Sequence, residues 1–555
     1  MKATSGNSMS TGSAAAGTPP SRRGGRPPTP INTPAEIVET IGWQPRVPIP
    51  LPRPNGVVSP ASALGPRPKH KLVVLGDSIS QGFRSLAISD TALSWPAMVA
   101  RYGGLGPFRH PTFDAPAECP GFPLNLEAVL RGIEWPRTGA DLVTETRLVR
   151  RLHELCDGVE DYWERGRGSR RISAAASAIG RRPDLINDNL ACWGQDVRDA
   201  FALTMENLQY RIETAPKRGD QRFALTPSVP YERSAALTMA GARASDTCTS
   251  LARVLGEDGG IETLVVALGA NNILSSVIDF TVNWTDDESL GRYDEVDHKA
   301  KFTAWTPEHF RSEYDLLLAE IDKIAAKNVI VLTVPHVTIV PGVRGVGTKM
   351  YHDRYFARYT RPWISDDQFS PNRHPCLTGD QLRVLDYAVD LYNDHIVQRV
   401  EERGADSAPD RGWLVLDLAG LLDRLAFRRY LIDDQAQPDW WTPYDLPEAF
   451  SELSPVPDTR YLGSDRFGRT QGGLISLDGV HPTTLGYSLI AREVMNAMAT
   501  LGVPLAAGEP DYSEIIAADT LLSEPLPQLD SVLNGVDLIN RTVDLVQALR
   551  GSPPL

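Results

Sequence analysis

The chain has few cysteines, no long apolar run and no excess of positive charge. Its 555 residues include five cysteines, which are odd in number, widely spaced and without a C-x-x-C pair. This pattern argues against a disulfide framework and against a zinc site, and we expect no bound metal. Neither an apolar run of about 18 residues nor the apolar N-terminal stretch of a secretory signal is present. We therefore expect a soluble, cytoplasmic protein, although a non-standard export route would leave no such mark.

The formal charge of −14 is unevenly distributed along the chain. The first 71 residues carry nine Lys or Arg and two Glu, so the remaining residues carry −21. Because such a body would repel a phosphate backbone, we expect no nucleic-acid partner.

Residues 1–68 are rich in Ser, Gly, Thr and especially Pro, as in the stretch Pro48-Ile49-Pro50-Leu51-Pro52-Arg53-Pro54. A segment with so little apolar surface cannot offset the entropy that it would lose on ordering. We expect a disordered, basic arm here, whose contact with an acidic partner or with the acidic body stays open.

From residue 69 onward, short aliphatic runs alternate with long amphipathic stretches, a pattern typical of a parallel sheet covered by helices. We expect a three-layer α/β/α sandwich with a mainly parallel five-stranded sheet. The expected strands are 72–75, 189–192, 263–268, 329–334 and 413–418. The expected helices are 92–101, 196–213, 307–326, 379–402 and 484–501.

The expected domain covers residues 69–508 and contains four connections that are much longer than usual. We interpret these connections, at about 103–187, 273–306, 336–378 and 419–475, as insertions, some of which should shape a ligand crevice at the carboxyl ends of the strands. Residues 509–555 form a C-terminal extension, in which we expect a helix at 531–550 to pack on the body.

A serine follows the first expected strand in the sequence Gly76-Asp77-Ser78-Ile79. A tight strand-to-helix turn exposes such a hydroxyl at the sheet edge and directs backbone amides at an oxyanion that forms beside it. Read alone, Gly-Asp-Ser is an ordinary turn.

Two further turns follow expected strands. Gly194 lies beyond 189–192, where a glycine lets a carbonyl group approach the main chain closely. Asn271 lies beyond 263–268, and its amide can donate to an oxyanion without carrying a charge. Each has an ordinary reading as a turn residue.

The sequence Asp478-Gly479-Val480-His481 lies near the C-terminal end of the expected domain. Histidine can accept a serine proton and return it to a leaving group, and an adjacent carboxylate orients the neutral ring. The order Ser, Gly, Asn, Asp-x-x-His therefore predicts a catalytic serine hydrolase site.

These four blocks resemble those of the SGNH hydrolases, also called the GDSL esterase and lipase family. Ser78, Gly194, Asn271 and His481 match the four residues that give the family its name, while Ile79 replaces Leu and Asn272 stands where the family often has Asp. The resemblance implies a flavodoxin-like fold that needs no metal or organic cofactor. It also implies that Ser78 is the nucleophile, His481 the base and Asp478 its orienting carboxylate, with an oxyanion hole formed by Ser78, Gly194 and Asn271.

The leading hypothesis is hydrolysis of a small carboxylic ester, such as a lipid or an acylated sugar, through an acyl-serine. Acyl transfer to a sugar or other alcohol would use the same residues, and a binding protein on an inactive scaffold is a third reading. His336 and the pair Trp440-Trp441 each have both a structural and a site reading. The sequence leaves the acyl chain length and the oligomeric state open.

Overall fold

The computed structural model describes residues 25–53, 68–113, 119–132, 142–176, 182–215, 226–286, 299–350, 353–406, 411–432, 436–527 and 529. Within these ranges, no helix is both long and apolar enough to cross a membrane.

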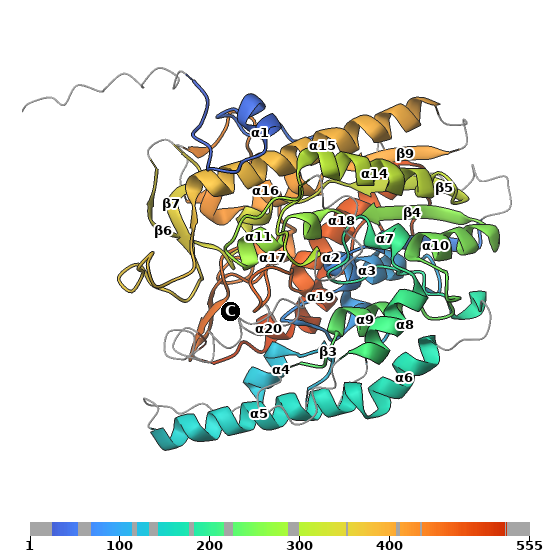
Figure 1. Ribbon diagram of the computed structural model, residues 1–555, viewed down its shortest axis with the longest axis horizontal. Coiled ribbons are helices and arrows are strands. Elements are labelled where there is room, and N and C mark those ends of the chain that lie inside the picture. The colour runs from blue at the N-terminus through green and yellow to red at the C-terminus, as the bar shows by residue number, and fades with distance from the viewer. Residues whose placement is uncertain are drawn as a thin grey trace, which may run out of the picture.

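A four-stranded parallel sheet forms the centre of the fold (Figure 1). Its strands lie in the order β1 (His70–Gly76), β4 (Ile261–Ala267), β5 (Ala326–Leu332) and β9 (Gly412–Leu416). Their aliphatic sequences suit strands that are buried on both faces. The four strands agree with the expected runs 72–75, 263–268, 329–334 and 413–418, so the α/β class is confirmed.

The expected fifth strand, 189–192, is wrong as an element. This segment lies along β1 with a single parallel bridge between Asn189 and Val74. The amide of Asp188 would face β1 in a regular strand, as those of Leu190 and Cys192 do, but it donates to the carbonyl of Arg109 instead. The amides of Leu190 and Cys192 still donate to the carbonyls of Val74 and Gly76, so the segment runs beside the sheet edge.

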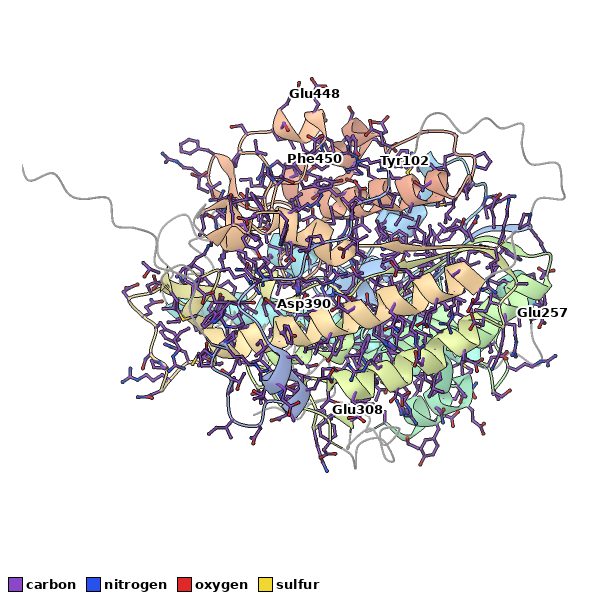
Figure 2. The ribbon with its side chains drawn as sticks, turned by 90° about the horizontal axis from the view of Figure 1, so that it is seen from above. Tyr102, Glu257, Glu308, Asp390, Glu448 and Phe450 are labelled. Atoms are coloured by element: carbon purple, nitrogen blue, oxygen red, sulfur yellow. The ribbon has the colours of Figure 1, made fainter. Side chains whose placement is uncertain are left out.

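Successive side chains of the strands enter two separate cores, one on each face of the sheet. Val73, Leu264 and Val329 enter the first core, which also contains residues of α10 (Cys248–Glu257), α14 (Pro307–Ile321) and α15 (Gly379–Asp406). Val74 and Val265 enter the second, with residues of α3 (Trp95–Tyr102), α16 (Leu418–Leu425), α18 (Thr484–Thr500) and α19 (Tyr512–Ala518). Figure 2 shows α14 and α15 side by side, with Glu308 at the start of α14 and Asp390 on α15. The result is an α/β sandwich.

Four of the five expected helices correspond to α3, α14, α15 and α18, with ends shifted by a few residues. The expected helix 196–213 is instead two helices, α7 (Asp199–Ala202) and α8 (Met205–Thr214). Thr204 starts the second one, because it forms a reciprocal capping box with Asn207.

The connections between the strands contain further elements. Besides α3, α7, α8 and α10, those between β1 and β4 are α2 (Ser78–Gln81), β2 (Ala87–Ile88), η2 (Thr91–Leu93), β3 (Phe122–Pro123), α4 (Leu126–Arg131), the 23-residue helix α5 (Leu142–Glu164), α6 (Arg167–Ala176), η3 (Pro183–Leu185) and α9 (Pro230–Thr238). Later in the chain come η4 (Ala270–Asn272), α11 (Ser275–Ile278), η5 (Val337–Ile339), β6 (Arg344–Lys349), β7 (Phe356–Thr360), β8 (Leu377–Thr378), η6 (Phe427–Leu431), α17 (Glu448–Ser451), β10 (Gly463–Asp465), β11 (Gly468–Gln471) and α20 (Thr520–Ser523). Figure 1 shows α5 along the side of the molecule opposite α15.

Residues 25–53, part of the expected disordered arm, lie against the body instead. The short helix α1 (Ala35–Thr40) has Ile37 fully buried, and Ile41 just after it is also buried. Arg46 pairs with the buried Asp417 at 3.3 Å, and Asp417 also accepts the Ile49 amide at 2.7 Å. These apolar and ionic contacts together hold the proline-rich stretch on the body. Its composition alone does not predict this docking. The helix expected at 531–550 lies outside the described residues.

Candidate functional site

Ser78 is the first residue of α2, directly after the end of β1. Asp77 caps this short helix, because its side chain accepts a hydrogen bond from the Ile79 amide at 3.1 Å. The turn requires glycine at position 76, since a Cβ there would lie 2.5 Å from Ser80 Oγ and 3.2 Å from the carbonyl oxygen of Ala267. The sequence therefore places Ser78 at the carboxyl edge of the sheet, as expected.

The Ser78 hydroxyl, His481 and Asp478 form one hydrogen-bonded chain. His481 Nε2 lies 2.9 Å from Ser78 Oγ, and His481 Nδ1 lies 3.1 Å from Asp478 Oδ2. In the tautomer that satisfies both contacts, Nδ1–H donates to the carboxylate and Nε2 accepts the hydroxyl hydrogen. The imidazole can then accept a proton from Ser78 and remain paired with Asp478.

The side chain of Asp478 is only 2% exposed and accepts several hydrogen bonds. Its Oδ1 accepts the amides of Val480 at 2.9 Å and His481 at 2.8 Å, and Oδ2 accepts the Leu86 amide at 3.2 Å. Burial acts to raise the pKa of Asp478, but the contact with the His481 ring and the amides of His481 and Val480 outweigh it and hold the pKa below its usual range. The group thus remains an anionic acceptor at neutral pH.

Local contacts fix the loop that carries His481. The Ser476 amide donates to the His481 carbonyl at 2.8 Å, and the Ser85 amide donates to Ser476 Oγ at 2.9 Å. The Phe83 ring packs on the imidazole with the two ring centres 4.7 Å apart. The segment that follows α2 therefore holds both the carboxylate and the ring of the C-terminal loop.

Gly194 lies in a turn that is joined to the end of β1 and to α2. The Cys192 amide donates to the Gly76 carbonyl at 3.0 Å, and the Trp193 amide donates to Gln81 Oε1 at 2.8 Å. Gly194 has φ +77°, a conformation that favours glycine, and a Cβ there would lie 3.3 Å from the Tyr231 ring. Other side chains would therefore strain this turn.

Asn271 lies in η4, which begins three residues after the end of β4. Its amide nitrogen donates to the carbonyl of Gln195 at 2.9 Å, so the Gly194 and Asn271 turns are hydrogen-bonded to each other. Asn272 contributes to the same junction, because its Oδ1 accepts the Val197 amide at 3.3 Å. This acceptor is one that an aspartate would also supply.

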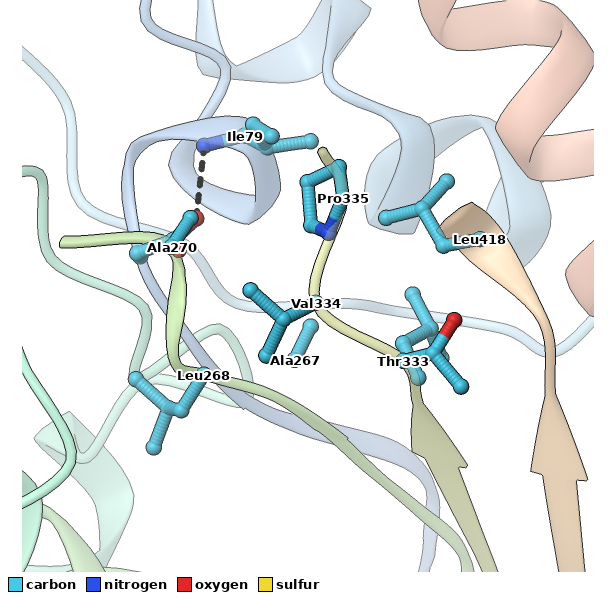
Figure 3. Close-up of a pocket in the computed structure, with 10 residues that line it drawn as sticks. Ile79, Ala267, Leu268, Ala270, Thr333, Val334, Pro335 and Leu418 are labelled. Atoms are coloured by element: carbon cyan, nitrogen blue, oxygen red, sulfur yellow. Dashed lines mark hydrogen bonds between the residues drawn. The ribbon is translucent and has the colours of Figure 1, made fainter. Parts of the chain in front are cut away.

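A small and largely apolar pocket lies beside the Ser78 turn, at the carboxyl ends of the strands (Figure 3). Ile79, Ala270, Val334, Pro335 and Leu418 surround it. Asp77 also lines the pocket, and its burial raises the pKa of its carboxyl group to about 7 despite the amide of Ile79 and the nearby His481. An acid that titrates near neutral pH therefore lies next to Ser78.

His336 and Trp441 have structural contacts in this fold, and the Trp440 ring packs on the ring of Tyr430 with the two ring centres 6.2 Å apart. His336 is buried between Asp423 and Asp390, with both ring nitrogens 2.9 Å from a carboxylate oxygen. Trp441 is buried and donates to the carbonyl of Asp423 at 3.1 Å. These contacts are those of residues that stabilise the fold, so they favour the structural interpretation.

Sequence reasoning missed Phe83, Gln81 and Tyr231, which support the site rather than form its hydrogen-bonded chain. Gln81 lies three residues after Ser78 on one helical turn, and this spacing is a signal that could have been used. Nothing in the sequence marks Phe83 or Tyr231, because their partners lie far away in the chain.

Among the described residues, no group of three or more His, Cys, Asp or Glu side chains is arranged to hold a metal ion. In comparisons with known proteins, no protein-family model and no curated protein matches this chain.

Proposed function

We propose that the protein is a serine hydrolase that cleaves carboxylic esters through a covalent acyl-serine intermediate. The observation that carries this proposal is the hydrogen-bonded chain from Ser78 Oγ through His481 to the buried Asp478, at 2.9 and 3.1 Å. Such a chain provides a nucleophile, a base and an orienting carboxylate in one arrangement. The resemblance of the four sequence blocks to the SGNH hydrolases supports the same reaction.

The reaction begins when Ser78 Oγ attacks the ester carbonyl carbon. His481 Nε2 accepts the hydroxyl proton as the new carbon–oxygen bond forms, and Asp478 stabilises the resulting imidazolium. The proton then passes from Nε2 to the alcohol oxygen as the ester bond breaks, which leaves an acyl group on Ser78. A water molecule that gives its proton to His481 attacks this acyl group, and the carboxylic acid leaves as Ser78 regains its hydrogen.

Negative charge develops on the carbonyl oxygen during both attacks. The amides of Ser78 and Gly194 and the side chain of Asn271 are the donors that we assign to it. This assignment is supported by two contacts that link their turns, from the Trp193 amide to Gln81 Oε1 and from Asn271 to the Gln195 carbonyl. Removal of one such donor typically lowers kcat by about 10²- to 10³-fold.

The direct test is hydrolysis of 4-nitrophenyl acetate by Ser78→Ala and His481→Ala. Each substitution should lower kcat by more than about 10³-fold, because the members of such a triad act as a unit. Ser80→Ala is the matched control, since Ser80 lies on the same helix, is fully buried and has a hydroxyl with no hydrogen-bond partner among the described residues. Unchanged turnover in folded Ser78→Ala would reject the proposed function.

A further inference from the structure

Lys299 bridges a buried carboxylate, that of Asp196, and a largely buried one, that of Asp199. Its Nζ lies 2.5 Å from Asp196 Oδ2 and 2.6 Å from Asp199 Oδ2, whose side chains are only 2% and 13% exposed. Burial disfavours the positive charge of Lys299, but Asp196 and Asp199 outweigh this and raise its pKa above the usual range. Without the lysine, two like charges would face each other in a site with little water, which is strongly unfavourable.

Both carboxylates belong to the segment that follows Gly194. Asp196 Oδ1 accepts the Asp199 amide at 2.9 Å, and this hydrogen bond closes the turn between the two residues. The Tyr231 hydroxyl donates to Asp199 Oδ2 at 3.1 Å, and the ring of the same tyrosine lies against Gly194. The position of Asp199 is therefore coupled to the backbone of Gly194 through one aromatic side chain.

Lys299 itself comes from the return segment of the insertion at 273–306, and this segment is joined to the Asn271 turn. Ala304 forms a parallel bridge with Trp284, and the Trp305 amide donates to the Asn272 carbonyl at 2.8 Å. The segment that carries Lys299 is therefore bonded both to the residues after Gly194 and to the Asn271 turn.

Neighbouring cationic side chains have other partners. Arg198 lies between the two aspartates in the sequence but pairs with Glu313 at 2.7 Å. Arg211, on α8, lies 3.6 Å from Glu232. Within the described part of the chain, Lys299 forms the ion pairs with Asp196 and Asp199.

We propose that Lys299 is a positioning residue that holds the Gly194 amide in place for the oxyanion. This proposal rests on the function proposed above, because it takes the Gly194 amide to be an oxyanion donor of the same site. Lys299 links the Gly194 turn to the segment that holds the Asn271 turn. The positions of the two oxyanion donors are therefore coupled. Lys299 acts by fixing the position of the Gly194 turn and not by contacting the substrate, because its ammonium group is paired with the two carboxylates.

The test compares Lys299→Met with Lys299→Met/Asp199→Asn, using 4-nitrophenyl acetate as substrate and a phenylboronic acid as an analogue of the tetrahedral intermediate. The single variant should lose about 10- to 100-fold in kcat with KM within about twofold, because a misplaced donor weakens only the transition state. Boronate affinity should fall by a similar factor. The double variant should recover most of both losses, since an amide at position 199 removes the repulsion and keeps an acceptor for Tyr231.

Lys323→Met is the matched control, because Lys323 also forms an ion pair, with Glu320 at 2.5 Å, but is half exposed just beyond the end of α14. Its kcat should equal that of the wild type. If Ser78→Ala is inactive but Lys299→Met keeps the wild-type kcat, the positioning role is wrong while the proposed function stands. A kcat loss that Asp199→Asn does not restore would also overturn the positioning role. Turnover that survives Ser78→Ala would instead overturn the function itself.

Discussion

His481 Nε2 lies 2.9 Å from Ser78 Oγ, although 403 residues separate the two in the sequence. Ser78 is fixed by the end of β1, and His481 by a loop that leads into α18. The contact therefore depends on the packing of α18 against the face of the sheet to which Val74 of β1 contributes. A chain that folds in this way brings a hydroxyl, an imidazole and a carboxylate into one line.

Replacement of Asp478 by asparagine tests the role of the carboxylate. Asparagine keeps an oxygen for the amides of Val480 and His481, but it favours the wrong histidine tautomer and cannot stabilise the imidazolium. We expect kcat for 4-nitrophenyl acetate to fall by about 10³- to 10⁴-fold with the melting temperature little changed. Steady-state kinetics beside thermal unfolding will check this, and a loss below tenfold would contradict the assigned role of Asp478.

Gly194→Ala tests the turn after the sheet-edge segment. Because Gly194 has φ +77° and lies against Tyr231, alanine should shift its amide and lower kcat by at least about tenfold. Gly502→Ala is a matched control, since Gly502 has the same φ of +77° with open space around it. Both variants should lose about 1 kcal/mol of stability, as measured by urea unfolding, but only Gly194→Ala should lose activity. Equal activity in the two variants would argue against a role for Gly194.

Asp77 should make stability depend on pH. Its pKa is raised from 3.8 to about 7 by burial, so between these values the unfolded chain releases a proton that the folded protein retains. The unfolding free energy of the wild type should therefore fall relative to Asp77→Asn as pH rises through this window, by at most about 1.4 kcal/mol per pH unit. Above pH 7 the difference should be constant. Asparagine is an equally good helix cap, and urea unfolding at several pH values will show whether the difference varies or stays flat.

The N-terminal helix provides a test of the docked segment. Ile37 is fully buried, whereas the adjacent Val38 is 39% exposed on the same helix. Ile37→Ala should cost about 2 to 4 kcal/mol of unfolding free energy because it leaves a cavity, while Val38→Ala should cost less than about 1 kcal/mol. Equal effects of the two substitutions would mean that α1 does not pack on the body in solution.

The sheet was largely predictable from the sequence, because its four strands are aliphatic runs that need cover on both faces. The fifth segment was not, since its pairing with β1 is interrupted at Asp188, whose amide donates to the carbonyl of Arg109, about 80 residues away. The docking of residues 25–53 also depends on distant partners such as Asp417. Proline content alone could not reveal it.

The residues of the candidate site likewise fall into those that local sequence patterns predict and those that only the fold identifies. Ser78, Gly194 and Asn271 follow strands or a strand-like segment, and Asp478 and His481 are close in sequence, so local patterns were sufficient to select them. Lys299 belongs to an insertion whose return path only the fold defines. Its partners, Asp196 and Asp199, look like ordinary helix-start residues in the sequence.

The most direct test of the central claim is labelling with a fluorophosphonate, followed by intact-mass and peptide mass spectrometry. The reagent modifies a serine only when a neighbouring base activates it. We predict one adduct per chain, located on Ser78, and no adduct in Ser78→Ala or His481→Ala. A wild-type protein that stays unlabelled, or a Ser78→Ala variant that labels as well as the wild type, would contradict the account.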